Sequence, residues 1–210
     1  MSATKVSSEF DILNKINDFN IPVIIGPTSI GKTNLSINIA KKLDAEIVSI
    51  DSRQIYKNFR IGTGQPSQKE LKTVKHHLID KIDSTVVITA YQYIKMVESV
   101  FKNTKKRIVI VCGSLLYLNC LINGIINIPS SSKSIKRKIE SKVLERGVNK
   151  SYNDLYKIDK LHATKIHVND IKKIVRAYEI IELTSQTPTE AYKKYKECFN
   201  LISDNLFLVK

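Results

Sequence analysis

The stretch IPVIIGPTSIGKTNLSINIAKKL, residues 21–43, decides the fold. It begins with a short β-branched apolar run, which is typical of a parallel strand buried on both faces. Gly26 to Thr33 then fit the pattern G-x-x-x-x-G-K-[ST], and apolar residues recur at near-helical spacing from Leu35 to Leu43. The order strand, glycine loop, helix predicts a phosphate-binding loop at the start of a parallel α/β sheet.

The glycine loop carries the groups that bind a phosphate or diphosphate. Its two glycines allow the backbone to curl so that successive N–H groups point at an anion, and the following helix adds the positive end of its dipole. Lys32 supplies a mobile positive charge, and the Thr33 hydroxyl can ligate magnesium. We therefore expect diphosphate or nucleotide binding, with ATP as one candidate, by the whole loop: Gly26, Pro27, Thr28, Ser29, Ile30, Gly31, Lys32 and Thr33.

Two further strand–helix units follow the loop. EIVSI at 46–50 and IVIV at 108–111 are predicted as buried strands, and polar clusters follow them directly, DSRQ at 51–54 and CGS at 112–114. In open parallel sheets ligands bind beyond the carboxyl ends of the strands, so both clusters should lie beside the phosphate loop. The three units predict a P-loop α/β core, with a parallel sheet flanked by helices, over residues 21–129.

Asp51 is the carboxylate that follows the second strand. Beside a bound phosphate it can bind magnesium or accept a proton from a substrate. It can equally cap the next helix without touching a substrate. Its position alone leaves these roles open.

The charge balance indicates a polyanionic partner. Lys and Arg number 34 against 20 Asp and Glu, which gives a net charge of +14. Nucleic acid is the natural inference, although a lysine-rich genome would produce the same composition. The basic, thinly apolar residues 130–165 are predicted to form a small helical insertion. Residues 166–210 are expected to return to the core, with LFLV at 206–209 as a strand, and residues 1–20 to form an N-terminal leader.

The remaining composition points to the cytoplasm. Three cysteines have no metal-like or redox spacing, which suits a reducing compartment. No apolar run approaches a membrane span, and residues 1–20 lack the apolar core of a signal peptide. Neighbouring His76 and His77 do not share a face, so no metal site is expected there.

Arg176 lies within the apolar stripe of a helix predicted over residues 166–182. A guanidinium on a buried face needs an anion. Glu179 or Glu182 could supply it within the protein, or a bound phosphate could supply it from outside.

Six motifs in order resemble those of the tRNA dimethylallyltransferase family, also called tRNA isopentenyltransferases. The chain departs from the family pattern at Cys112 and Ser114, where Gly and Thr are usual, and is expected to end before the family's C-terminal tRNA-binding helices. The motifs are GPTSIGKT at 26–33, DSRQIY at 51–56, IGTGQP at 61–66, HHLID at 76–80, CGSLLYLNCLINGI at 112–125 and HVNDIKKIVRAYEI at 167–180.

The resemblance implies transfer of a dimethylallyl group from dimethylallyl diphosphate to N6 of the adenosine next to the anticodon, position 37, of tRNA. It implies a cytoplasmic monomer that uses Mg²⁺, with Asp51 and Thr33 as catalytic residues and Thr33 as the metal ligand. The basic insertion would touch the tRNA stem. The residues implied to meet the tRNA are Asp51, Ser52, Arg53, Gln54, Ser114, Ile171, Lys172, Lys173, Ile174, Val175 and Arg176.

Three other functions are weighed against this one. An adenylate isopentenyltransferase would use a free nucleotide as acceptor, and the basic insertion and the DSRQ cluster favour tRNA instead. A small nucleotide kinase would need paired arginines in a lid, and Arg53, Arg60, Arg107 and Arg176 are too scattered. A non-catalytic RNA-binding remnant of the transferase is the third.

Overall fold

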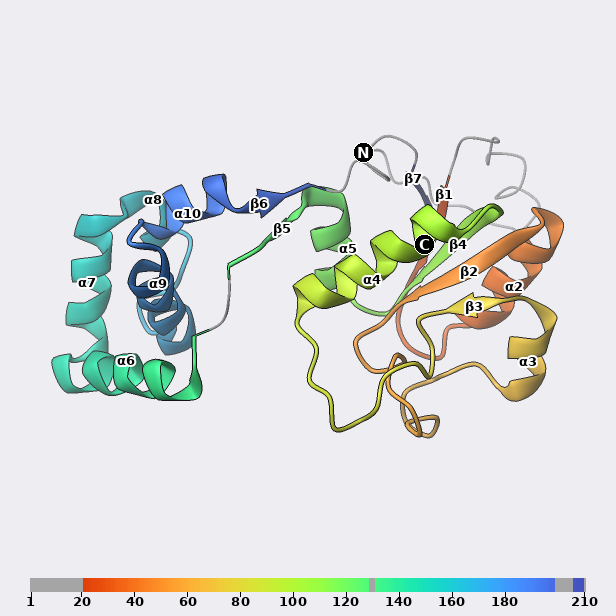
Figure 1. Cartoon of the computed structure of the whole chain (residues 1–210), viewed down its shortest axis with the longest axis horizontal. Helices are drawn as coiled ribbons and strands as arrows, with labels where there is room; N and C mark the ends of the chain where they lie inside the picture. Colours follow the sequence, from red (N-terminus) through yellow and green to blue (C-terminus); the bar gives the residue numbers. More distant parts are fainter. Residues whose placement is uncertain (1–20, 129–130, 199–205, 210) are drawn as a thin grey trace. The chain divides into compact units, whose positions relative to one another are not determined.

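The computed structural model describes residues 21–128, 131–198 and 206–209 (Figure 1). The leader expected at 1–20, and Ser130 of the expected insertion, lie outside the described residues. The chain divides into two compact units. Unit 1 holds the described residues up to Ile125 and again from Cys198, and unit 2 is Ile126–Glu197.

Unit 1 is built on a five-stranded sheet in the order β3-β2-β4-β1-β7. All its neighbouring strands run parallel. This confirms the predicted parallel sheet, and it confirms LFLV as a strand, β7, beside β1. The strands are β1 (Ile21–Ile25), β2 (Ala45–Ile50), β3 (His76–His77), β4 (Arg107–Cys112) and β7 (Leu206–Val209).

Helices cover both faces of this sheet. Successive residues of each strand point to opposite faces, so neighbouring residues pack against different helices. Val23 of β1 packs into a cluster with Tyr93 and Leu121, whereas its neighbour Ile24 packs with Ile39. The α/β fold class expected from the sequence is thereby confirmed. The helices of unit 1 are α2 (Lys32–Lys42), α3 (Gln68–Thr73), α4 (Ala90–Asn103) and α5 (Leu115–Asn123).

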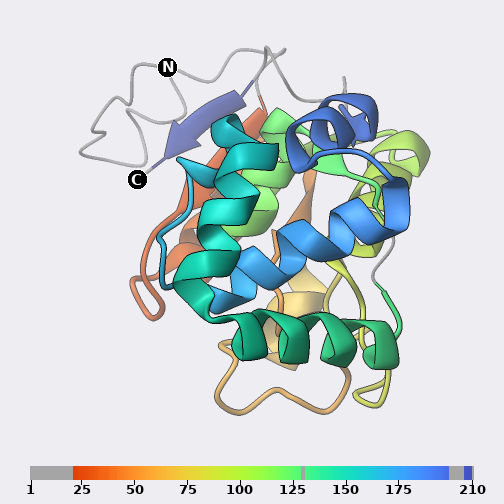
Figure 2. The ribbon, with the colours of Figure 1, turned by 90° about the vertical axis from the view of Figure 1, so that its left-hand side faces the viewer.

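Unit 2 is helical. Figure 2 looks onto its helices, with α9 drawn in blue, and α9 packs against α6, α7 and α10. None of the helices in the described part of the chain is long and apolar enough to cross a membrane. The helices of unit 2 are α6 (Lys133–Arg146), α7 (Val148–Ile158), α8 (Lys160–Ala163), α9 (Ile171–Thr184) and α10 (Pro188–Lys194). Strand β5 (Ile125–Ile126) begins at the last residue of unit 1 before the boundary and pairs with β6 (Lys196–Glu197).

The boundaries of unit 2 differ from the insertion expected at 130–165. The apolar stripe of α9, with Ile174 and Val175, packs on Ile139 and Val143 of α6. Helices α9 and α10 therefore belong with the preceding helices rather than with the core that was expected to resume at residue 166. The chain rejoins unit 1 at Cys198.

Asp159, which is 6% exposed, ties the start of α8 to the start of α10. Its carboxylate accepts hydrogen bonds from the backbone N–H of His162 at 2.9 Å and of Thr189 at 2.7 Å, and from the Thr189 hydroxyl at 2.7 Å. Burial by itself would raise the pKa of Asp159, but these hydrogen bonds outweigh it and hold the pKa below its usual value.

An Asp159→Ala variant of the full chain should therefore lose about 3 kcal/mol of unfolding free energy near neutral pH, because charge-assisted hydrogen bonds are lost and buried N–H groups are left unpaired. A carboxyl whose pKa is lower in the folded state stabilises the fold above its unfolded pKa, and this contribution disappears as the pH falls through the folded pKa. The difference between variant and parent should accordingly shrink as the pH falls below the usual pKa of an aspartate, about 3.9.

Urea unfolding followed by circular dichroism checks this prediction. Glu140→Ala, which removes an exposed carboxylate of α6, is the matched control and should change the unfolding free energy by less than about 0.5 kcal/mol. Equal stability of the two variants near neutral pH would refute the structural role of Asp159.

Candidate active site

The carboxyl ends of β1, β2 and β4 lie level in the sheet. Ile25 of β1 and Ile50 of β2 are both in register with Cys112 of β4. The next residue of each strand therefore emerges at the same edge, which brings Asp51 beside the glycine loop and beside Gly113. This is the juxtaposition that the strand-end clusters predicted.

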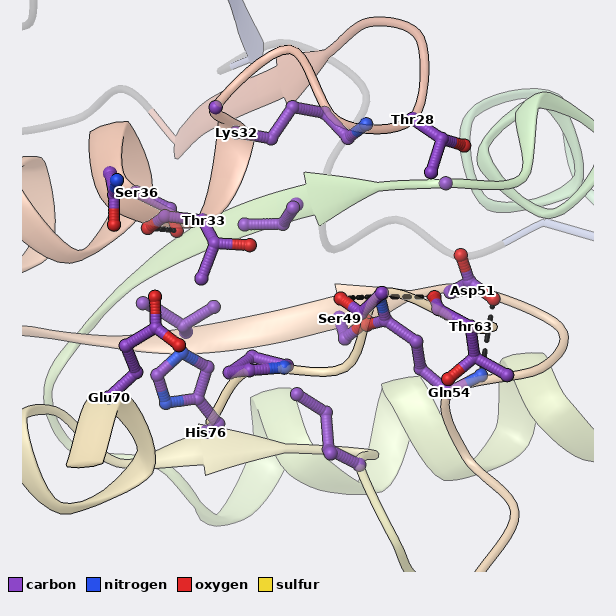
Figure 3. Close-up of a pocket in the computed structure, with 18 of the residues that line it drawn as sticks. Thr28, Lys32, Thr33, Ser36, Ser49, Asp51, Gln54, Thr63, Glu70 and His76 are labelled. Atoms are coloured by element: carbon purple, nitrogen blue, oxygen red, sulfur yellow. Dashed lines mark hydrogen bonds between the residues drawn. The ribbon is translucent and has the colours of Figure 1, made fainter. Parts of the chain in front are cut away.

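A pocket of about 280 Å³ lies at this edge (Figure 3). It combines six residues of the glycine loop with residues from α2, β2, the 61–66 loop, α3 and β3. The lining residues are Gly26, Thr28, Ser29, Gly31, Lys32, Thr33, Asn34, Ser36, Ile47, Ser49, Asp51, Gln54, Thr63, Gly64, Pro66, Glu70, His76, Ile79, Val111 and Gly113.

The glycine loop is shaped to receive an anion. Gly31 has φ 94°, a left-handed conformation that favours glycine, and it caps α2 without any side-chain hydrogen bond. The first N–H groups of α2 have no partner within the helix and point toward the loop. The Lys32 Nζ donates to the carbonyl oxygens of Gly26 at 2.9 Å and Pro27 at 2.6 Å. The ammonium group is thus folded over the loop, where phosphate oxygens would be stronger acceptors.

Two of the predicted loop residues face elsewhere. Pro27 and Ile30 do not line the pocket that contains Asp51. They line a neighbouring, more apolar pocket of about 700 Å³, together with Leu35 and Leu115. At Ile30 only the backbone N–H is then left for phosphate binding, and Pro27 has no N–H to donate.

Asp51 uses one carboxylate oxygen for the turn that follows β2. Its Oδ1 accepts hydrogen bonds from the N–H groups of Arg53 at 2.8 Å and Gln54 at 3.2 Å. The sequence left open a helix cap at Asp51, but the structure has turns and no helix at residues 52–58, so the carboxylate caps a turn instead. Its Oδ2 lies beside Gly113 and receives no hydrogen bond from the residues that the structure describes. The carboxylate is therefore held in place by one oxygen while the other remains for a substrate.

Gly113 makes the space that the Asp51 carboxylate occupies. The N–H groups of Gly113 and Ser114 both donate to the Ile50 carbonyl, at 2.9 and 3.0 Å, and so join the end of β4 to the end of β2. A Cβ atom at residue 113 would lie 2.9 Å from the Asp51 Cγ and would overlap its Oδ2. Only glycine fits here while Asp51 keeps its position. Ser114, predicted to contact tRNA, is the half-buried N-cap of α5.

Tyr93 of α4 fixes the backbone that carries Asp51. This tyrosine is fully buried, and its hydroxyl donates to the Ser49 carbonyl at 2.7 Å and accepts from the Asp51 N–H at 3.1 Å. Burial raises the pKa of Tyr93 far above its usual value, so the hydroxyl keeps its proton.

Two glutamines clamp the 61–66 loop onto the turn that contains Asp51. The Gln54 side chain accepts from the Ser49 hydroxyl at 2.9 Å and donates to the Thr63 and Gly64 carbonyls at 3.2 and 2.9 Å (Figure 3). The Gln65 amide donates to the Gln54 carbonyl at 2.7 Å. Gln54, predicted to contact tRNA, therefore also shapes the pocket wall.

The other end of the pocket includes Ser36, Glu70 and His76, which the sequence did not predict as site residues. His76 Nδ1 bonds to the Val74 carbonyl at 2.8 Å, and its buried Nε2 has no hydrogen-bond partner among the described residues. Burial lowers the pKa of His76, so its ring is neutral near pH 7. Among the described residues, no three His, Cys, Asp or Glu side chains cluster in a way that could hold a metal.

The other predicted RNA-contacting residues lie outside the pocket. Ser52 and Arg53 are exposed on the turn after β2, and the segment 171–176 lies on α9 of unit 2. There, Lys172 and Lys173 are exposed. The prediction is wrong for the side chains of Ile174 and Val175, which are buried in the core of unit 2 and cannot contact an RNA.

The anion that pairs with Arg176 is a carboxylate of unit 2. Its guanidinium pairs with the buried Glu179 at 3.2 Å and donates to the Ile128 carbonyl at 3.4 Å. Of the partners that the sequence left open, Glu179 is the one observed.

Comparison with known proteins shows which protein family this sequence matches. The sequence model of the IPP transferase family matches residues 54–206. The tRNA dimethylallyltransferase of Chloroherpeton thalassium is 39% identical over 174 residues, and that of Francisella philomiragia is 38% identical over 176 residues. These alignments cover 81% and 82% of this chain but 54% and 57% of the relatives. The chain thus spans about half the length of the curated relatives it matches.

Solved structures agree with the fold. A eukaryotic dimethylallyltransferase acting on tRNA has a TM-score of 0.69 at 26% identity, with 90% of this chain and 47% of that chain covered. The full-length tRNA isopentenylpyrophosphate transferase from Bacillus halodurans has a TM-score of 0.50 at 31% identity, with 81% and 57% covered. These are similarities to longer proteins.

Proposed function

The chain belongs to the IPP transferase family, and from this premise we propose that it transfers a dimethylallyl group from dimethylallyl diphosphate to N6 of the adenosine next to the anticodon, position 37, in tRNA. One observation carries the proposal. A single pocket is lined by the phosphate loop and by a carboxylate, Asp51, that keeps one oxygen outside its own turn. The transfer needs both groups: one to hold the departing diphosphate and one to hold the nucleophile.

On the donor side, the diphosphate binds the loop at 26–33. Lys32 exchanges its bonds to the Gly26 and Pro27 carbonyls for bonds to diphosphate oxygens. The bond between the prenyl C1 and the diphosphate oxygen breaks, and the electron pair leaves with the oxygen. The N–H groups and dipole of α2 stabilise the negative charge that develops there.

On the acceptor side, Asp51 Oδ2 accepts a hydrogen bond from the N6 amine. N6 forms a new bond to the prenyl C1 and loses one proton, which the carboxylate takes up. Because Oδ1 stays bonded to Arg53 and Gln54, the carboxylate keeps its orientation during the transfer. The loop that Gln54 clamps shields the allyl cation from water, which would otherwise quench it.

We propose Mg²⁺ as the cofactor, with the Thr33 hydroxyl as its protein ligand. Thr33 lies in the first turn of α2 and lines the same pocket as Asp51. Mg²⁺ at phosphate sites takes most of its ligands from phosphate oxygens and water, so one hydroxyl in this oxygen-rich pocket fits it. When bound, it neutralises part of the diphosphate charge. ATP would compete for the same loop.

We further propose that the basic surface of unit 2, which includes Lys172 and Lys173, meets the tRNA backbone. Phosphate contacts of this kind would make the affinity fall as salt rises. We also propose a cytoplasmic location, which suits a tRNA substrate. All the pocket residues that the proposal needs come from one chain, so we propose a monomer.

Mass spectrometry of nucleosides from tRNA incubated with the chain and dimethylallyl diphosphate tests this function. Prenylated adenosine is the expected nucleoside, and its absence with a tRNA that carries guanosine at position 37 would assign it to that position. In a parallel incubation with AMP, prenylated AMP in place of prenylated tRNA would identify an adenylate isopentenyltransferase. Binding of tRNA without any product at high protein concentration would identify a non-catalytic remnant.

Lys32→Ala should raise the dissociation constant for dimethylallyl diphosphate by about 10- to 100-fold, because a charge-assisted hydrogen bond contributes about 1.5–3 kcal/mol. Isothermal titration calorimetry of the full chain measures it. Lys41→Ala, an exposed lysine near the other end of α2, is the control and should leave the affinity unchanged. Equal affinities of the two variants would count against binding of the diphosphate by the loop.

A further inference from the structure

Large apolar side chains stand exposed beside the Asp51 pocket. Phe59 is 51% exposed and Ile61 is 99% exposed. With Arg53 and Tyr56 they line a second pocket, of about 420 Å³. We call these four residues the ledge.

The ledge sits on a backbone held by several polar contacts. The Arg60 guanidinium pairs with Asp80 at 3.2 Å, and the Asn58 N–H donates to the same carboxylate at 3.1 Å. The Thr63 hydroxyl donates to the Phe59 carbonyl, and the Gln65 amide donates to the Tyr56 carbonyl at 3.1 Å. Large apolar side chains that a backbone held in this way presents to water indicate a binding surface.

The ledge adjoins the proposed acceptor site. Thr63 lines both pockets, and the N–H of Arg53 donates to Asp51 Oδ1. A molecule whose reacting group is held at Asp51 Oδ2 would therefore extend onto the ledge.

The chemistry of the ledge fits an unpaired nucleobase. Tyr56 and Phe59 offer aromatic surfaces, and Ile61 adds an apolar one. The guanidinium of Arg53 is exposed and makes no hydrogen bond or ion pair with the residues that the structure describes, so it can meet a base face or a phosphate. Stacking on aromatic and guanidinium planes is how proteins hold splayed bases of RNA loops.

We infer that the ledge stacks the unpaired nucleobase that neighbours the acceptor adenosine in the anticodon loop. The inference rests on the proposed function, since it takes an anticodon loop as the substrate. It assigns to Phe59 and Ile61 a role in substrate positioning that the chemistry at Asp51 does not require.

Binding of an anticodon stem-loop RNA by the full chain, followed by fluorescence anisotropy, tests the ledge. The double substitution Phe59→Ala with Ile61→Ala should weaken binding by about 5- to 100-fold, the usual range for loss of base stacking. Val87→Ala removes another apolar side chain, 89% exposed, from unit 1 outside the ledge and should leave the affinity unchanged. Unchanged affinity for dimethylallyl diphosphate in all variants shows that the pocket remains folded.

A second RNA, in which the neighbouring base is replaced by an abasic residue, completes a double-mutant cycle. The abasic RNA should bind the parent chain more weakly by a similar factor, and should bind the ledge variant no more weakly than the intact RNA does. Equal loss with both proteins would overturn the ledge inference and leave the proposed function standing. No binding of either RNA by the parent chain would overturn both. Loss of self-association in the ledge variant, with RNA affinity unchanged, would make the ledge a contact between copies.

Discussion

An Asp51→Asn variant should transfer the dimethylallyl group about a thousandfold more slowly than the parent chain, since a positioned base contributes about 10²- to 10⁴-fold. The amide retains an oxygen for the N–H groups of Arg53 and Gln54, so the turn after β2 should persist. What it loses is the capacity to take the proton from N6. Affinity for the stem-loop RNA should stay within a few fold, because the phosphate contacts are untouched.

Single-turnover assays with saturating RNA and dimethylallyl diphosphate measure this effect. Asp51→Ala removes the turn bonds as well and should be at least as slow. Asp44→Asn makes the same chemical change at a carboxylate whose side chain is 84% exposed, and should react at the parent rate. Turnover by Asp51→Asn within a few fold of the parent would remove Asp51 from the chemistry.

Gly113→Ala should slow the transfer by about a hundredfold or more without preventing binding of either substrate. The added Cβ would meet the Asp51 carboxylate, whose Cγ lies 2.9 Å from that position, so the carboxylate must move. A displacement of about 1 Å at a reacting group can cost about 10²-fold. Single-turnover rates, with the affinities for both substrates measured separately, distinguish a slower transfer from weaker binding.

The same substitution in an Asp51→Ala background separates this cause from a general loss of stability. With the carboxylate absent there is no side-chain oxygen to collide with, so Gly113→Ala should add little to the loss of activity or of unfolding free energy. If the two substitutions instead had additive effects on the rate, Gly113 would be acting by some route other than Asp51.

The core of unit 1 was predictable because its signals are local. The strand, glycine loop and helix of residues 21–43 form one continuous pattern, and the register of β1, β2 and β4 then places the strand-end residues together. The extent of unit 2 was not predictable in the same way. The apolar stripe of α9 shows that one face is buried, but not that it packs on α6.

In the candidate site too, the residues with a local sequence signal were predicted and the long-range contacts were not. Asp51 was found because it follows a buried strand. The contacts that hold it were missed, because they join residues far apart in sequence: the hydroxyl of Tyr93 meets the N–H of Asp51 across 42 residues, and Gly113 approaches it from another strand. Composition and spacing carry no signal for such pairs, nor for His76 at the other end of the pocket.

The most direct measurement is a crystal structure of the chain with a non-cleavable thio-analogue of dimethylallyl diphosphate. We predict diphosphate oxygens within hydrogen-bond distance of the Lys32 Nζ and of the first N–H groups of α2, with the prenyl C1 directed toward Asp51 Oδ2. A diphosphate seated away from the glycine loop, or a prenyl group directed away from Asp51, would contradict the proposed chemistry.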